Sequence, residues 1–73
     1  MIKRTPVKSG NIAEIGFDPA TNTLAVLFKN GGLYHYAGVD SAKHAALMGA
    51  DSIGKHLHAN IRGQHQHSKI DPE

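Results

Sequence analysis

The chain has 73 residues, a formal net charge of +2 with its six histidines neutral, and no cysteine. A domain of this length buries only about 60% of the surface that its unfolded chain exposes, so we expect one domain with a small core. The lack of cysteine excludes disulfides, thiolate nucleophiles and cysteine-ligated zinc. No apolar run approaches the roughly 18 residues of a membrane span, and Met1–Pro6 lacks the apolar core of a signal peptide. The composition therefore predicts a soluble, monomeric protein of the cytoplasm.

Residues 1–10 form a basic arm, and the three apolar-alternating segments that follow it predict an antiparallel meander. The expected strands are Ile12–Asp18, Thr23–Lys29 and Leu33–Ala37. Asp18-Pro19 favours a turn after the first strand, and Asn30-Gly31-Gly32 supplies residues that tolerate positive φ in a tight hairpin. Alternation places Ala13, Ile15 and Phe17 on one face of the first strand. The middle strand is apolar on both faces, which leaves the first and third strands as the edges of the sheet.

Two short helices are predicted after the meander. Each begins at a pair of residues that can cap a helix, Asp40 or Ser41 for the first and Asp51 or Ser52 for the second. In the second helix Ile53, Leu57 and Ile61 recur every four residues and so form one apolar stripe. Residues 63–73 have no periodicity and are expected to form a flexible C-terminal tail. The predicted fold class is α+β, a three-stranded antiparallel meander followed by two short helices packed on one face.

The order of these residues resembles the KTSC domain family, over about residues 4–62. The matching positions are Val7-Lys8-Ser9, Ile12, Gly16-Phe17-Asp18-Pro19, Leu24, Phe28, Gly31-Gly32, Tyr34, Tyr36, Val39, Leu47, Ala50, Ser52, Gly54 and Ile61-Arg62. The family is named from its occurrence at the C-terminus of some lysyl-tRNA synthetases, and it also occurs as small stand-alone bacterial and phage proteins. The resemblance implies one KTSC-like domain over residues 1–62, acting as an accessory or interaction module with no established enzymatic chemistry.

The chain departs from the family pattern at three positions. Asp40 stands where the family often has proline, which changes only how the first helix begins. His44 and Leu57 stand where aromatic residues are common, so the helix face here is less aromatic than in the family. If those aromatic residues form a shared ligand site, this chain lacks part of it.

No set of residues has the spacing of a catalytic or metal site. The acidic residues are scattered, and the serines have no neighbouring base in a nucleophile arrangement. On a helix His56 and His58 point about 200° apart, so they cannot share a metal ion. His65 and His67 could chelate a metal only in an extended tail without supporting ligands. We therefore expect no enzyme activity, no metal and no cofactor.

The candidate partner-binding residues are basic or aromatic. They are Lys3, Arg4, Val7, Lys8, Tyr34, Tyr36, Lys55 and Arg62. Lys55 and Arg62 are seven residues apart and are expected to share one helical face, so together with the N-terminal arm they can form a basic patch. The alternative is that these charged side chains form an ordinary solvated surface. Tyr34 and Tyr36 either stack on bases or pack in the core. Either edge strand of the meander could also pair with an extended partner segment.

The leading hypothesis from the sequence is a non-enzymatic protein-interaction module. By analogy with small phage proteins that redirect host machinery, its expected partner is bacterial RNA polymerase, in the host cytoplasm if the protein is phage-encoded. The alternative is an accessory domain that binds RNA or single-stranded DNA through Tyr34, Tyr36 and the basic residues.

Overall fold

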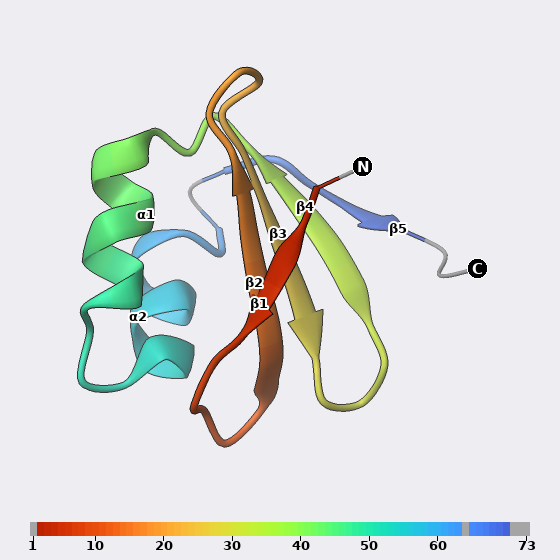
Figure 1. Ribbon diagram of the computed structural model, residues 1–73, viewed down its shortest axis with the longest axis vertical. Coiled ribbons are helices and arrows are strands. Elements are labelled where there is room, and N and C mark those ends of the chain that lie inside the picture. Colours follow the sequence, from red (N-terminus) through yellow and green to blue (C-terminus); the bar gives the residue numbers. More distant parts are fainter. Residues whose placement is uncertain (1, 64, 71–73) are drawn as a thin grey trace.

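The computed structural model describes residues 2–63 and 65–70. It contains five strands and two helices within these residues (Figure 1). In chain order they are β1 (Arg4–Pro6), β2 (Ile12–Asp18), β3 (Thr23–Phe28), β4 (Leu33–Ala37), α1 (Ser41–Met48), α2 (Ile53–Asn60) and β5 (His67–Ile70). The strands form one antiparallel sheet in the order β1-β2-β3-β4-β5.

The predicted three-stranded meander is wrong, because the sheet has five strands. The three predicted strands are its centre, and each edge is extended by a short strand. β1 comes from the basic arm and sets Arg4 opposite Gly16, while β5 comes from the predicted tail and sets His67 opposite Tyr36. Both strands satisfy backbone groups that β2 and β4 would otherwise leave unpaired. The flexible tail is therefore also wrong for His67–Ile70; residues 64 and 71–73 lie outside the described part of the chain.

The two helices lie on one side of the sheet, as the sequence predicts (Figure 1). Asp40 caps α1 by accepting a hydrogen bond from the Lys43 amide at 2.8 Å. Ser52 caps α2 in the same way from the Lys55 amide at 3.4 Å. Side-chain oxygens at this position satisfy amides that have no partner within the helix.

The core lies between this face of the sheet and the helices. Its residues are Ile12, Ile15, Leu24, Val26, Tyr36, Val39, Leu47, Ile53, Leu57 and Ile61. The predicted stripe of Ile53, Leu57 and Ile61 is confirmed, since all three are buried. They anchor α2 to the sheet, and this fixes which side of the helix remains accessible.

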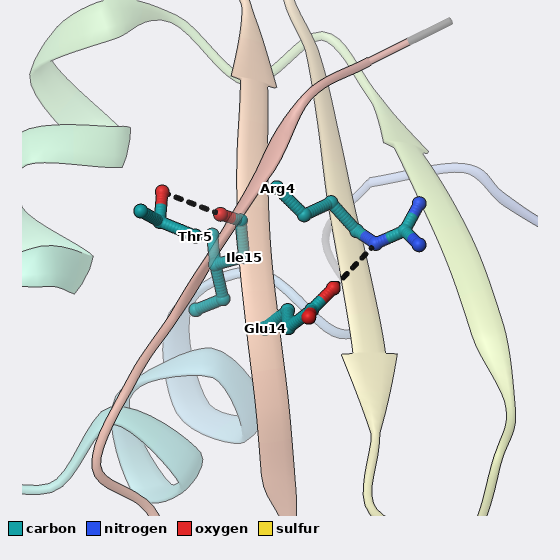
Figure 2. Close-up of polar contacts among 4 residues, drawn as sticks. All are labelled: Arg4, Thr5, Glu14 and Ile15. Atoms are coloured by element: carbon teal, nitrogen blue, oxygen red, sulfur yellow. Dashed lines mark hydrogen bonds and ion pairs between the residues drawn. The ribbon is translucent and has the colours of Figure 1, made fainter.

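The N-terminal arm crosses β2 at Gly16, on the side of the sheet away from the helices. Figure 2 shows Arg4 and Glu14 on this side, where the Arg4 Nε donates to Glu14 Oε1 at 3.1 Å. Thr5 points the other way, and its hydroxyl donates to the Ile15 carbonyl at 3.4 Å. A Cβ at position 16 would lie 2.3 Å from the Lys3 carbonyl oxygen. Only glycine permits this close approach.

Candidate binding groove

The loop between β1 and β2 lies against the first turn of α2. The Ser9 hydroxyl accepts hydrogen bonds from the amides of Asn11 and Ile12 at 3.4 and 3.3 Å, and it donates to Asn11 Oδ1 at 3.2 Å. A Cβ on Gly54 would lie 2.7 Å from the same Asn11 Oδ1. The loop can therefore approach α2 this closely because residue 54 has no side chain.

A groove of about 520 Å³ opens between this loop, the end of β3 and α2. It is lined by Ser9, Gly10, Asn11, Phe28, Ser52, Gly54, Lys55, Leu57, His58 and Arg62. Phe28 is half-buried and supplies apolar surface to the groove, whereas Leu57 is 1% exposed and belongs mainly to the core. The volume of the groove lies within the roughly 300–1,000 Å³ of small-ligand sites.

Three basic side chains line the groove together. Lys55 and His58 are three residues apart on α2, so they share one face of the helix. Arg62 follows the helix and is held beside it because its amide donates to the Leu57 carbonyl at 2.7 Å. No Asp or Glu is among the described residues that line the groove. The groove therefore favours negatively charged ligands.

The neighbouring tyrosines belong mainly to the core. Tyr36 is 2% exposed, and its burial raises the pKa of the phenol, an effect that the positive charge of Arg62 partly opposes. Tyr34 is half-buried and packs edge-on against Phe28, with ring centroids 5.7 Å apart. Only Phe28 of these three rings lines the groove.

The comparisons with known proteins agree with the resemblance found in the sequence. The model of the KTSC domain family matches residues 8–65, which is most of the chain. The chain belongs to the KTSC domain family. The crystal structure of a KTSC domain protein from Yersinia pestis is 35% identical to it and superposes with a TM-score of 0.93, over 97% of this chain and 100% of that one.

A second relative extends the family to another bacterium. This is an uncharacterized protein of Stutzerimonas stutzeri (strain A1501), which is 36% identical over 64 residues, or 88% of this chain and 90% of the relative. The superposition thus covers the whole of the Yersinia pestis chain, and the sequence match covers most of the Stutzerimonas protein. Among the described residues of this KTSC domain, neither helix is long and apolar enough to cross a membrane.

The groove brings together only two of the eight partner-binding residues predicted from the sequence. These are Lys55 and Arg62. Lys8 is exposed next to Ser9, but it is not part of the lining. Val7 packs against the core, and Arg4 pairs with Glu14 on the other side of the sheet.

The remaining predicted residues lie elsewhere. Lys3 is exposed in the arm, while Tyr34 and Tyr36 pack under or beside the helices. The edges proposed for strand addition are also occupied, because β1 pairs with β2 and β5 pairs with β4. The accessible edges of this KTSC domain are instead β1 and β5.

Sequence reasoning missed several groove residues. His58 could have been found, since it lies three residues after Lys55 and so shares its side of the helix. Ser9, Asn11 and Phe28 gave no such signal, because packing brings them to α2 from distant parts of the chain.

The two departures from the family's aromatic positions have separate locations. Leu57 is a core residue that also belongs to the groove lining. His44 lies on α1 and stacks on Phe17, with ring centroids 4.7 Å apart and planes within 10°. Burial lowers the pKa of His44. Asp40, the third departure, is the cap of α1.

The other histidines are spread over the surface of this KTSC domain. His56 lines a smaller hollow of about 250 Å³ on a different side of α2 from His58. The His65 ring lies 2.9 Å from the Ala37 carbonyl oxygen and 3.2 Å from the Lys43 ammonium nitrogen. The His67 ring lies beside Tyr34 and Tyr36. The described residues contain no group of three His, Cys, Asp or Glu side chains close enough to share a metal ion.

Proposed function

We propose that this KTSC domain is a non-enzymatic interaction module that binds an acidic segment of a partner protein in the groove. The observation that carries the proposal is the alignment of Lys55, His58 and Arg62 along a hollow whose described lining includes no acidic residue.

The chemistry of the lining supports a carboxylate-bearing ligand. The Arg62 guanidinium can hold a carboxylate by two parallel hydrogen bonds, and the Lys55 ammonium acts as a compact point charge. Asn11 and Ser52 add hydrogen-bonding groups at the same opening. Because Lys55 and Arg62 are exposed, salt should weaken their attraction for the partner.

Bacterial RNA polymerase is the partner to test first. This part of the proposal rests on the small size and basic charge of the chain and on its analogy with phage proteins that bind host machinery. The groove itself is suited to any partner with an accessible acidic segment. The domain would then act as a monomer in the bacterial cytoplasm.

A pull-down from bacterial lysate with the tagged full chain tests the proposal. The double variant Lys55→Gln/Arg62→Gln should retain at least about tenfold less polymerase than the native chain, since two charged contacts are lost. The matched control is Lys3→Gln/Lys69→Gln, which changes the net charge equally outside the groove. Equal loss in both variants would show that only net charge matters. Failure to retain polymerase with the native chain would remove this partner.

A second candidate function is binding of RNA or single-stranded DNA, and Phe28 is the observation that favours it. This half-buried ring lines the groove beside the three basic side chains, an arrangement that suits a stacked base flanked by phosphates. Tyr36, for which the sequence left base stacking and core packing open, is buried. Fluorescence anisotropy with a labelled oligonucleotide would show an affinity that falls steeply as salt rises. No binding at low salt would eliminate this candidate.

A further inference from the structure

We infer that His65 holds strand β5 on the sheet at neutral pH and releases it in acid, so that the last strand is a pH-sensitive element of the domain. His65 lies between α2 and β5, and β5 is the edge strand beside β4 (Figure 1). The His65 ring contacts Ala37 at the end of β4 and Lys43 on α1. Neither His65 nor these two partners lines the groove, so the inference is independent of the proposed function.

The two contacts of the His65 ring fix its protonation state. Nδ1 lies 2.9 Å from the Ala37 carbonyl oxygen, and Nε2 lies 3.2 Å from the Lys43 Nζ. The ammonium group has no lone pair, so Nε2 can only accept a hydrogen bond from it. The carbonyl oxygen has no proton, so Nδ1 must donate to it. Both hydrogen bonds therefore form together only in the neutral ring that carries its proton on Nδ1.

These hydrogen bonds join three elements next to the start of β5. Ala37 is the last residue of β4, and its amide donates to the Gln66 carbonyl at 2.8 Å, so residues 65 and 66 bind both of its backbone groups. The His65 amide donates to the Ile61 carbonyl at 3.2 Å, just after α2. Three of the four residues of β5 are exposed. Since β5 buries little side-chain surface, its position depends on backbone pairing and on the adjacent His65 contacts.

Protonation of His65 replaces an attraction with a repulsion. The imidazolium has no lone pair, so the hydrogen bond from Lys43 is lost and two positive charges face each other across about 3.2 Å. The other charged or titratable groups around this pair are Arg62, which forms a bridge with His65, His56, which lines a hollow with Lys43, and Asp40, which accepts from the Lys43 amide. No described carboxylate forms an ion pair with His65 or Lys43. The repulsion is therefore not neutralised locally.

The sign of the pH effect follows from the neutral ring. Histidine side chains change charge between about pH 5 and 8, so the His65 contacts stabilise β5 above this range, and their contribution is lost as the pH falls. Protonation of His67, which lies beside Tyr34 and Tyr36, adds cation–π attraction and so does not oppose the attachment of β5. Release of β5 leaves the edge of β4 without a partner. Such an edge can pair with an extended segment of another chain.

Nuclear magnetic resonance of the isotope-labelled full chain tests the inference in two ways. The ¹⁵N shifts of the His65 ring should place the proton on Nδ1 at about pH 7.5. Protection factors from amide exchange should fall about tenfold in β5, relative to Ile15 in β2, between about pH 7.5 and about pH 5.5, as expected for the loss of one hydrogen bond to a charged group. The ratio to Ile15 removes any general loss of stability. A ring proton on Nε2, or an unchanged ratio, would overturn the inference.

Two variants assign the effect to His65. His65→Asn keeps a group that can donate to the Ala37 carbonyl but does not titrate, so the fall in the ratio should be less than about twofold. His35→Asn is the matched control and should keep the full fall, because His35 lies opposite Ser68 on the other face of the same pair of strands from Tyr36. An equal fall in the native chain and in His65→Asn would contradict the inference. If His65→Asn fails to fold, the ring shifts of the native chain decide by themselves.

Discussion

Gly16→Ala should weaken the attachment of the N-terminal arm to the sheet. The added methyl group would lie 2.3 Å from the Lys3 carbonyl oxygen and 3.0 Å from both the Arg4 Cγ and the Ile2 Cγ2. The first of these atoms belongs to the backbone, so a side-chain rotation cannot relieve the clash. The arm itself has to move.

The size of the effect follows from this geometry. Restoring an ordinary contact of about 3.4 Å requires a shift of about 1 Å, and β1 is paired with β2 at Arg4 opposite Gly16 and Thr5 opposite Ile15. Overpacking of this kind costs about 1–3 kcal/mol, and each lost backbone hydrogen bond about 1 kcal/mol. We expect the free energy of unfolding to fall by about 2 kcal/mol, a large fraction of the roughly 3–5 kcal/mol available to so small a domain.

Urea unfolding followed by circular dichroism measures this loss. Gly10→Ala is the matched control, because a Cβ there meets no atom within 4 Å, and it should leave stability within about 0.5 kcal/mol of the native value. Amide exchange at Ile15 should quicken in Gly16→Ala but not in the control. A loss below about 0.5 kcal/mol for Gly16→Ala, with unchanged exchange, would refute the close crossing of the arm over β2.

Three further predictions concern other parts of the chain. Ser52→Ala removes the cap of α2 and should cost about 1 kcal/mol in urea unfolding, whereas Ser52→Asp should restore most of it; equal stability of both would contradict the cap. Burial lowers the pKa of His44, so the folded state favours the neutral ring and the stability of the domain should fall as the pH drops below about 6.5. Melting curves of His44→Tyr should show a smaller loss of stability over that pH range. An identical loss in the variant would assign the pH dependence to other groups. A chain that ends at Gly63 loses β5 and the contacts of β5 with Tyr34 and Tyr36, so the melting temperature of the domain should drop. An unchanged melting temperature would indicate that β5 adds no stability.

The central strands and both helices could be predicted because their signals are local. Gly31 has φ +97°, as expected for the turn between β3 and β4, and the caps at Asp40 and Ser52 lie where the sequence placed them. The set of β2 residues that face the core was predicted less well. A register shift between Ile12 and Glu14 breaks the alternation, so Ile12 is buried together with Ile15.

The outer strands could not be predicted, because their order comes from their partners. His67–Ile70 is mostly exposed and shows no strong alternation, so only the free edge of β4 determines its conformation. The same limit applies to the groove. Lys55 and Arg62 were predicted together as one helical face, but Arg62 lies beyond the end of α2 and reaches the groove from the turn that follows. Ser9 and Phe28 reach the groove through tertiary packing that no short sequence pattern encodes.

The strand order also determines how the chain folds. Within β1 to β4, each strand pairs with the one that follows it after a short loop, so these contacts are local. The pairing of Tyr36 with His67 is different, since both helices lie between these residues in sequence. We expect the β1–β4 sheet to form early and β5 to join only after α1 and α2 have packed, which makes the last strand the slow step of assembly.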